Sequence, residues 1–164
     1  MKILQYLFIS LSHKIIKLLP YTSIRILSVP IGTLYFLLTF RSSIKLFKRK
    51  DIFNELKIKY SPLIVKINYT RYWLETLWLT NKNFSKYITP HVEIENLEYV
   101  EKLKKQYPGL IFALPHLGNW EFAIPIGNSI KLNLLAVAEP LNNSYVLNWF
   151  KSLRESLGIE IIIG

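Results

Sequence analysis

The chain has 164 residues, of which 51% are hydrophobic and 14% aromatic, and its formal net charge is +10. This length suits one domain with a hydrophobic core, or a part of a larger domain. The chain contains no cysteine, which excludes disulfides and cysteine-ligated metal sites and is compatible with a reducing compartment.

The first 50 residues are basic and apolar, with nine Lys or Arg and no Asp or Glu. Such a segment is typical of a signal peptide, a membrane-surface anchor or a nucleic-acid-binding arm. Its aliphatic character argues against nucleic acid, and the lack of a small-residue cleavage site argues against a signal peptide. The most apolar stretch, residues 24–40, contains Arg25, Pro30 and Gly32, so we expect no clean membrane-spanning helix.

Instead, residues 1–50 are predicted to form two or three amphipathic helices that lie at a membrane interface. Pro20 is expected to end the first helix, and Pro30 with Gly32 to kink or end the second. The alternative is an ordinary pair of core helices with a solvated basic face. The bases expected to meet anionic headgroups are Lys2, Lys14, Lys17, Arg41 and those of the run 45–50.

Three further helices are expected before residue 110. The first is a short one at 51–60. A Ser-Pro start signal then opens a helix over 61–81, in which apolar residues recur at steps of three and four. Arg71 and Glu75 lie one turn apart on it, and we interpret them as a structural ion pair rather than as catalytic residues. The third helix spans 96–106 and stops at a Pro-Gly pair.

From residue 110 the pattern alternates between strands and helices. Three apolar runs, 110–114, 134–138 and 159–163, predict strands buried on both faces. The helices between them are expected to begin at Asn119 and at 142–143. This order implies an α/β fold, with a mostly parallel sheet flanked by helices and right-handed crossovers. Since no helix follows the last strand, we expect the sheet to be incomplete and the C-terminal half of the domain to be missing.

One segment, residues 114–121, concentrates side chains suited to catalysis. His116 follows a predicted strand and Glu121 falls in the first turn of the next helix, where ligands bind in open α/β sheets. A neutral histidine can accept the proton of an attacking hydroxyl, and a nearby carboxylate can orient it. Gly118 allows close backbone approach, and the helix N-terminus offers N–H donors to an oxyanion. On spacing alone, a structural histidine is an equal alternative.

Several blocks of the chain resemble the glycerolipid and lipid A type acyltransferases, whose signature is H-x4-D/E. Residues 114–121 are similar to the L-P-H-x-G-N-W-D segment of the phosphatidylinositol mannoside acyltransferases in that group. Residues 137–141 resemble their V-A-E-R-L block, residues 150–158 their F-x-x-x-R-x-x-L-G block, and residues 69–75 their Y-x-R-Y-W-x-E helix. The resemblance extends over nearly the whole chain.

The resemblance implies that His116 is the general base for the acceptor hydroxyl and that Glu121 supports it. The resemblance also implies that Glu139 and Arg154 line the active-site groove, and each has a simpler interpretation. Glu139 could be a solvated carboxylate at a strand end, and Arg154 a base that extends towards water. Pro140 replaces an arginine of the pattern. The residues expected to line the groove and bind substrate are Glu139, Arg154, Asn119 and Gly118.

The function implied is transfer of an acyl chain from acyl-CoA to a hydroxyl of a membrane glycolipid, most closely a phosphatidylinositol mannoside. The alternatives are a lipid A type or lysophospholipid acyltransferase, or an inactive membrane-binding fragment. We expect no metal or other cofactor and no nucleic acid. The expected partners are acyl-CoA, the glycolipid acceptor and anionic lipids on the cytoplasmic face of the plasma membrane. Residues 1–50 would form the docking segment and 51–164 the N-terminal part of the acyltransferase domain.

Overall fold

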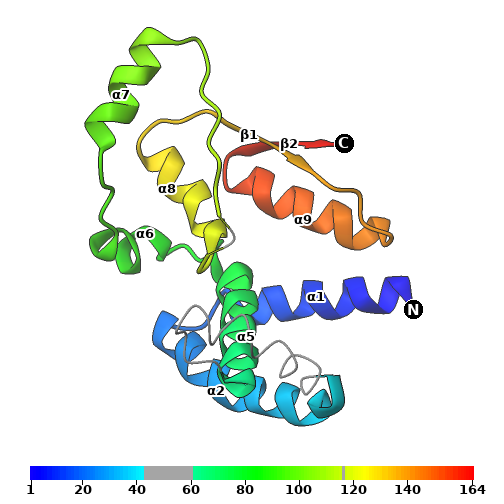
Figure 1. Ribbon diagram of the computed structural model, residues 1–164. Helices are drawn as coiled ribbons and strands as arrows, with labels where there is room; N and C mark the ends of the chain where they lie inside the picture. Colours follow the sequence, from blue (N-terminus) through cyan, green and yellow to red (C-terminus); the bar gives the residue numbers. More distant parts are fainter. Residues whose placement is uncertain (43–60, 116) are drawn as a thin grey trace.

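The computed structural model describes residues 1–42, 61–115 and 117–164, and Figure 1 shows mostly helices with one short sheet. The helix predicted at 51–60, the basic run 45–50 and the predicted domain boundary at residue 50 lie outside this description. The first elements are α1 (Lys2–Ile16), α2 (Tyr21–Leu38), α5 (Pro62–Trp78), α6 (Phe84–Tyr87), the 3-10 helix η1 (Thr89–His91) and α7 (Leu97–Gln106). They are followed by the 3-10 helix η2 (Trp120–Phe122), α8 (Ala123–Ser129), β1 (Leu134–Ala138), α9 (Ser144–Ser156) and β2 (Ile159–Ile163).

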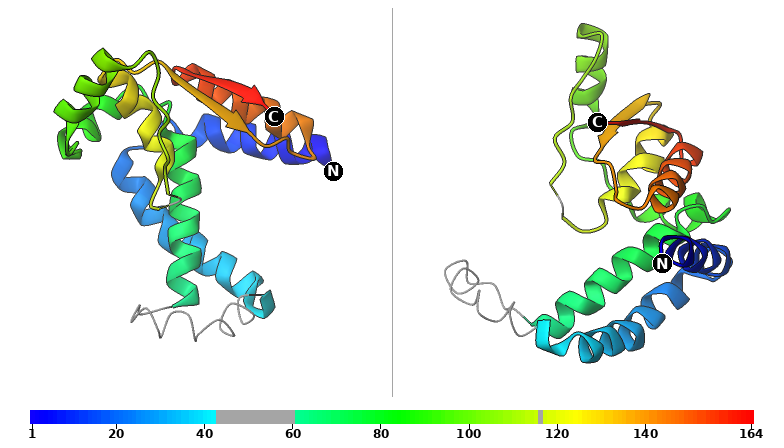
Figure 2. Two further views of the ribbon diagram at one scale, coloured as in Figure 1. Left: turned by 45° about the horizontal axis from the view of Figure 1, so that its top comes forward. Right: turned by 90° about the vertical axis from the view of Figure 1, so that its right-hand side faces the viewer.

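The main hydrophobic core lies where α1, α2, α5 and α6 meet. Ile24 and Trp78 are fully buried there, and the indole N–H of Trp78 donates to the carbonyl of Leu19 at 2.8 Å. Helices α2 and α5 cross so closely that a Cβ added to Gly32 would lie 2.6 Å from the Cα of Ile67. Glycine at this position therefore permits the packing of α2 on α5 that Figure 2 shows.

Local signals place the helix ends as predicted. Ser61 precedes α5, which has proline in its first turn, and Asn96 precedes α7. The side chain of Asn143 accepts a hydrogen bond from the N–H of Tyr145 and so caps α9. Gly158 follows that helix with φ +92°, a left-handed conformation in which glycine is unstrained.

Helix α2 differs from its prediction, because it runs through Pro30 and ends only at Leu38. A proline removes one backbone hydrogen bond, but the packing of α2 along α5 holds the rest of the helix together. By length and composition, α2 is the one helix of the described residues that is apolar enough to cross a membrane. This test does not show that α2 spans a membrane, so the expectation of no clean membrane-spanning helix stays a prediction.

Helix α1 packs on one side and exposes an apolar stripe on the other. Its His13 Nε2 lies 2.7 Å from the hydroxyl of Thr80, and its ring meets Trp149 of α9 edge-on. Figure 2 shows α1 beside α9, as the contacts between them require. The outward side chains at steps of three and four are Leu4, Phe8, Leu11 and Ile15, and Leu18 continues the stripe just beyond the helix.

Strands β1 and β2 are parallel neighbours, paired from Leu134 with Ile159 to Ala138 with Ile163, as the sequence predicts. Helix α9 connects them and packs with α8 on one face of the sheet (Figure 1). On the other face Leu135, Val137 and Ile162 are exposed. The prediction that these strands are buried on both faces is therefore wrong for the described part of the chain.

The strand predicted at 110–114 is absent from the described structure, where this segment has no regular secondary structure. Ile111 is fully exposed, and Leu114 is 56% exposed. The segment runs near β1 without pairing, and a pocket of about 510 Å³ lies between them. An apolar run favours burial, but a strand also needs a neighbour for its backbone N–H and C=O groups.

Candidate active site

A turn before η2 directs the end of the H-x4-E motif into the protein. Gly118 has φ +60°, and the side chain of Asn119 accepts a hydrogen bond from the N–H of Glu121 at 3.3 Å. This cap opens η2, in which Glu121 is buried. His116 lies outside the described residues, so its contact with Glu121 stays a prediction.

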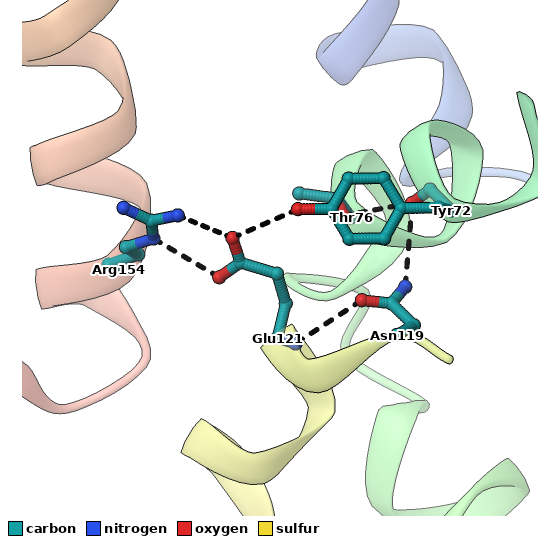
Figure 3. Close-up of polar contacts among 5 residues, drawn as sticks. All are labelled: Tyr72, Thr76, Asn119, Glu121 and Arg154. Atoms are coloured by element: carbon teal, nitrogen blue, oxygen red, sulfur yellow. Dashed lines mark hydrogen bonds and ion pairs between the residues drawn. The ribbon is translucent and has the colours of Figure 1, made fainter. Parts of the chain in front are cut away.

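The Glu121 carboxylate forms a two-pronged ion pair with Arg154 of α9 (Figure 3). Arg154 Nη2 lies 2.5 Å from Oε1, and Arg154 Nε donates to Oε2 at 3.1 Å. The hydroxyl of Tyr72, from α5, also donates to Oε1 at 3.4 Å. A carboxylate accepts about four hydrogen bonds, so these three leave capacity on Oε2 for one further donor.

Arg154 is held in place by aromatic rings as well as by Glu121. Its guanidinium carbon lies 5.1 Å from the ring centroid of Trp120 and 5.5 Å from that of Phe150. Such cation–π contacts are favourable where the cation is partly shielded from water. The charged end of Arg154 therefore points to the buried carboxylate of Glu121, and 18% of the side chain stays exposed.

Tyr72 was not among the residues predicted for the site. Burial, followed by the nearby Glu121 charge, raises the pKa of Tyr72 to about 12, although Arg154 opposes the shift. The phenol therefore stays protonated at neutral pH and acts as a donor. The sequence singles out Tyr72 only as part of the block 69–75, because its role depends on how α5, η2 and α9 pack together.

Glu75 connects this cluster to the N-terminal helices. Its Oε2 accepts a hydrogen bond from the side-chain amide of Asn119 at 3.1 Å, and its Oε1 accepts one from the Tyr21 hydroxyl at 3.2 Å. Among the described residues, Arg71 and Glu75 do not form an ion pair. The predicted structural pair was therefore wrong, because Glu75 is buried against Tyr21 and Asn119 instead.

Two pockets flank the cluster. One of about 400 Å³ has mainly apolar walls, including Phe150 and Ile161, and it contains both Glu139 and Arg154. The structure thus brings these two predicted groove residues together, with the exposed Glu139 just beyond β1. The other, of about 550 Å³, lies between α5 and the turn at Gly118. Within residues 1–42, 61–115 and 117–164, no three His, Asp or Glu side chains gather as metal ligands.

Comparison with known proteins identifies one family. A family model described as "Bacterial lipid A biosynthesis acyltransferase" matches residues 2–163, almost the whole chain. No curated protein and no solved structure matches the chain.

Proposed function

The chain belongs to the bacterial lipid A biosynthesis acyltransferase family, and on this premise we propose that it moves an acyl chain from acyl-CoA to a membrane glycolipid hydroxyl. Membership makes it a membrane-lipid acyltransferase and confirms the resemblance at the level of the family. The observation that carries the proposal is the buried Glu121, fixed by Arg154 and Tyr72 five residues after His116. A phosphatidylinositol mannoside is the acceptor we propose.

In the proposed reaction, His116 takes the proton of the acceptor hydroxyl as its oxygen attacks the thioester carbonyl. The carbon–sulfur bond breaks, and the thiolate leaves with the proton returned by the imidazolium. Glu121 supports His116 through the remaining acceptor capacity of its carboxylate. Arg154 and Tyr72 hold that carboxylate in a fixed orientation without taking part in the bond changes.

The pocket that contains Glu139 and Arg154 supports the donor side of the proposal. Its mainly apolar walls suit an acyl chain, and Glu139 follows the carboxyl end of β1. We therefore propose that the acyl chain enters this pocket. Gly118 and Asn119 are proposed to bind the acceptor, because they line the neighbouring pocket.

The exposed apolar stripe of α1 supports attachment to a membrane surface, where the bases of residues 1–42 meet anionic lipids. We propose that the protein is peripheral on the cytoplasmic face of the plasma membrane. The absence of cysteine is compatible with that reducing side.

A lipid A type acceptor is the second candidate, because the description of the matching family names lipid A biosynthesis. Mass spectrometry of the lipids that gain an acyl chain when the protein is expressed would separate the two acceptors. Acylation of a lipid A precursor, with mannosides unchanged, would contradict the mannoside proposal. If the protein binds vesicles and no lipid gains a chain, the result favours the alternative of an inactive membrane-binding protein.

His116→Ala tests the chemistry directly. Loss of a general base should lower the transfer rate by roughly 10²–10⁴-fold while vesicle binding is unchanged. His91→Ala is the matched control, since His91 is an exposed histidine at the end of η1. Retention of more than about a tenth of the wild-type rate in His116→Ala would show that another group removes the proton.

A further inference from the structure

Arg71, on α5, carries a positive charge that the proposed mechanism does not use. Its Nε is buried and has no hydrogen-bond partner in the described structure. No ion pair between described residues includes Arg71. A buried donor without a partner costs free energy, and more so when it belongs to a charged group. Such a group is a place to look for an absent ligand.

Arg71 lines the pocket of about 550 Å³ between α5 and the turn at Gly118. Tyr69, Tyr72 and Asn119 contribute to the same pocket, which is large enough for a lipid headgroup. It lies beside the end of the H-x4-E motif, because Gly118 and Asn119 belong to the turn that places Glu121.

Of the described residues that line this pocket, Glu75 alone carries a carboxylate, and its two oxygens accept hydrogen bonds from Tyr21 and Asn119. Glu75 therefore leaves the Arg71 Nε without a partner. Its charge, one helical turn from Arg71 on α5, partly offsets that of Arg71, so an anion here would be held by directional hydrogen bonds rather than by a strong field. A guanidinium presents a planar fork of donors that matches a phosphate or a carboxylate.

We propose that this pocket binds a phosphate or phosphodiester group and that Arg71 is its principal ligand. This inference rests on the proposed function, in which the phosphate belongs to one of the two substrates. It is part of either the headgroup of the acceptor lipid or the nucleotide part of acyl-CoA. Because the pocket adjoins Asn119 and Gly118, a phosphate bound there fixes its substrate close to the motif. Arg71 is thus a binding residue that touches substrate and leaves the proton transfer to other groups.

Binding can be measured without turnover on the full chain in detergent. Trp120 lines the pocket, so its fluorescence should respond to titration with inorganic phosphate, with a soluble glycerophosphoinositol or with CoA, at constant ionic strength. We expect Arg71→Gln to weaken phosphate binding at least about tenfold, and Arg71→Lys to retain part of it. Arg25→Gln removes the same charge from an exposed arginine of α2 and should change nothing.

Equal affinity of Arg71→Gln and the wild type, or equal weakening by Arg25→Gln, would overturn the proposal. Tighter, Arg71-dependent binding of glycerophosphoinositol than of CoA would assign the phosphate to the acceptor, and the reverse order to the donor.

A purely structural role for Arg71 predicts a different outcome in a second variant. Arg71→Met removes the buried, unpaired donor, so without ligand its Tm should equal or exceed that of the wild type. A clear fall in Tm would mean that Arg71 holds the fold together, and the proposal would be wrong.

His116→Ala separates this inference from the proposed function. It should retain the phosphate affinity of the wild type. Arg71-dependent phosphate binding without any acyl transfer would refute the function alone. His116-dependent transfer with unchanged phosphate affinity and unchanged acceptor and donor KM in Arg71→Gln would refute the phosphate site alone.

Discussion

Removing Arg154 from its ion pair with Glu121 should destabilise the protein more than removing the charge of Glu121. The Glu121 side chain is 1% exposed, whereas that of Arg154 is 18% exposed and is also held by aromatic rings. Among the described residues, Arg154→Met leaves the buried carboxylate only the 3.4 Å hydrogen bond from Tyr72, and removing one partner of a buried pair costs about 3–5 kcal/mol. Glu121→Gln leaves a cation that reaches water and two rings, so we expect a cost of about 1–3 kcal/mol.

A double-mutant cycle tests this reasoning. The variant with both changes has no uncompensated buried charge, so its cost should fall below the sum of the two single costs by about 2 kcal/mol or more. The free energy of unfolding would be measured by urea titration, followed by tryptophan fluorescence.

Additive costs, with a coupling energy below about 0.5 kcal/mol, would show that the pair is not a unit. A larger cost for Glu121→Gln than for Arg154→Met would refute the argument from burial. The exposed pair of Lys151 with Glu155 is the control, since its removal should cost at most about 1 kcal/mol.

Three other outcomes follow from features outside the ion pair. The folded-state pKa of Tyr72 is raised to about 12 from the ordinary 10.0, so its contribution to the free energy of unfolding is complete below pH 10 and is lost as the pH rises to 12. Urea titrations between pH 10 and 12 should therefore show a smaller loss of stability for Tyr72→Phe than for the wild type. Gly32→Ala should lower the free energy of unfolding by about 1–3 kcal/mol, because its Cβ would overlap the Ile67 backbone, whereas Gly109→Ala, with open space around it, should be nearly neutral in the same titration. Vesicle co-sedimentation should show stronger binding to anionic than to neutral lipid and release by salt, at about 1 kcal/mol per base near the surface; equal, salt-independent binding would mean that apolar insertion alone attaches the chain.

Features set by neighbouring residues could be predicted from the sequence. Helices α5, α7 and α9 begin directly after Ser61, Asn96 and Asn143, and the side chain of Asn143 caps α9. The two strands and their parallel pairing also follow from apolar runs separated by a helix. Neither the exposure of Leu135 nor the unpaired state of 110–114 could be predicted, because each depends on which elements cover the sheet.

The candidate site divides in the same way. The motif itself identifies Glu121, and family resemblance adds Arg154, but neither predicts that they bind each other. Their contact spans 33 residues of sequence, and the contact of Tyr72 with Glu121 spans 49. Contacts at such separations depend on how α5, η2 and α9 pack together, and the periodicity of each segment predicts a helix but not its neighbours.

Tyr72 and Trp120 line both pockets, so the two cavities share a wall. A ligand that immobilises these two rings from one side changes the surface that a ligand meets on the other. Thermodynamic linkage then requires reciprocity, since each ligand must alter the affinity of the other by the same factor. Two substrates bound across such a wall would occupy the protein together, and initial-rate plots at several fixed acceptor concentrations would intersect rather than run parallel.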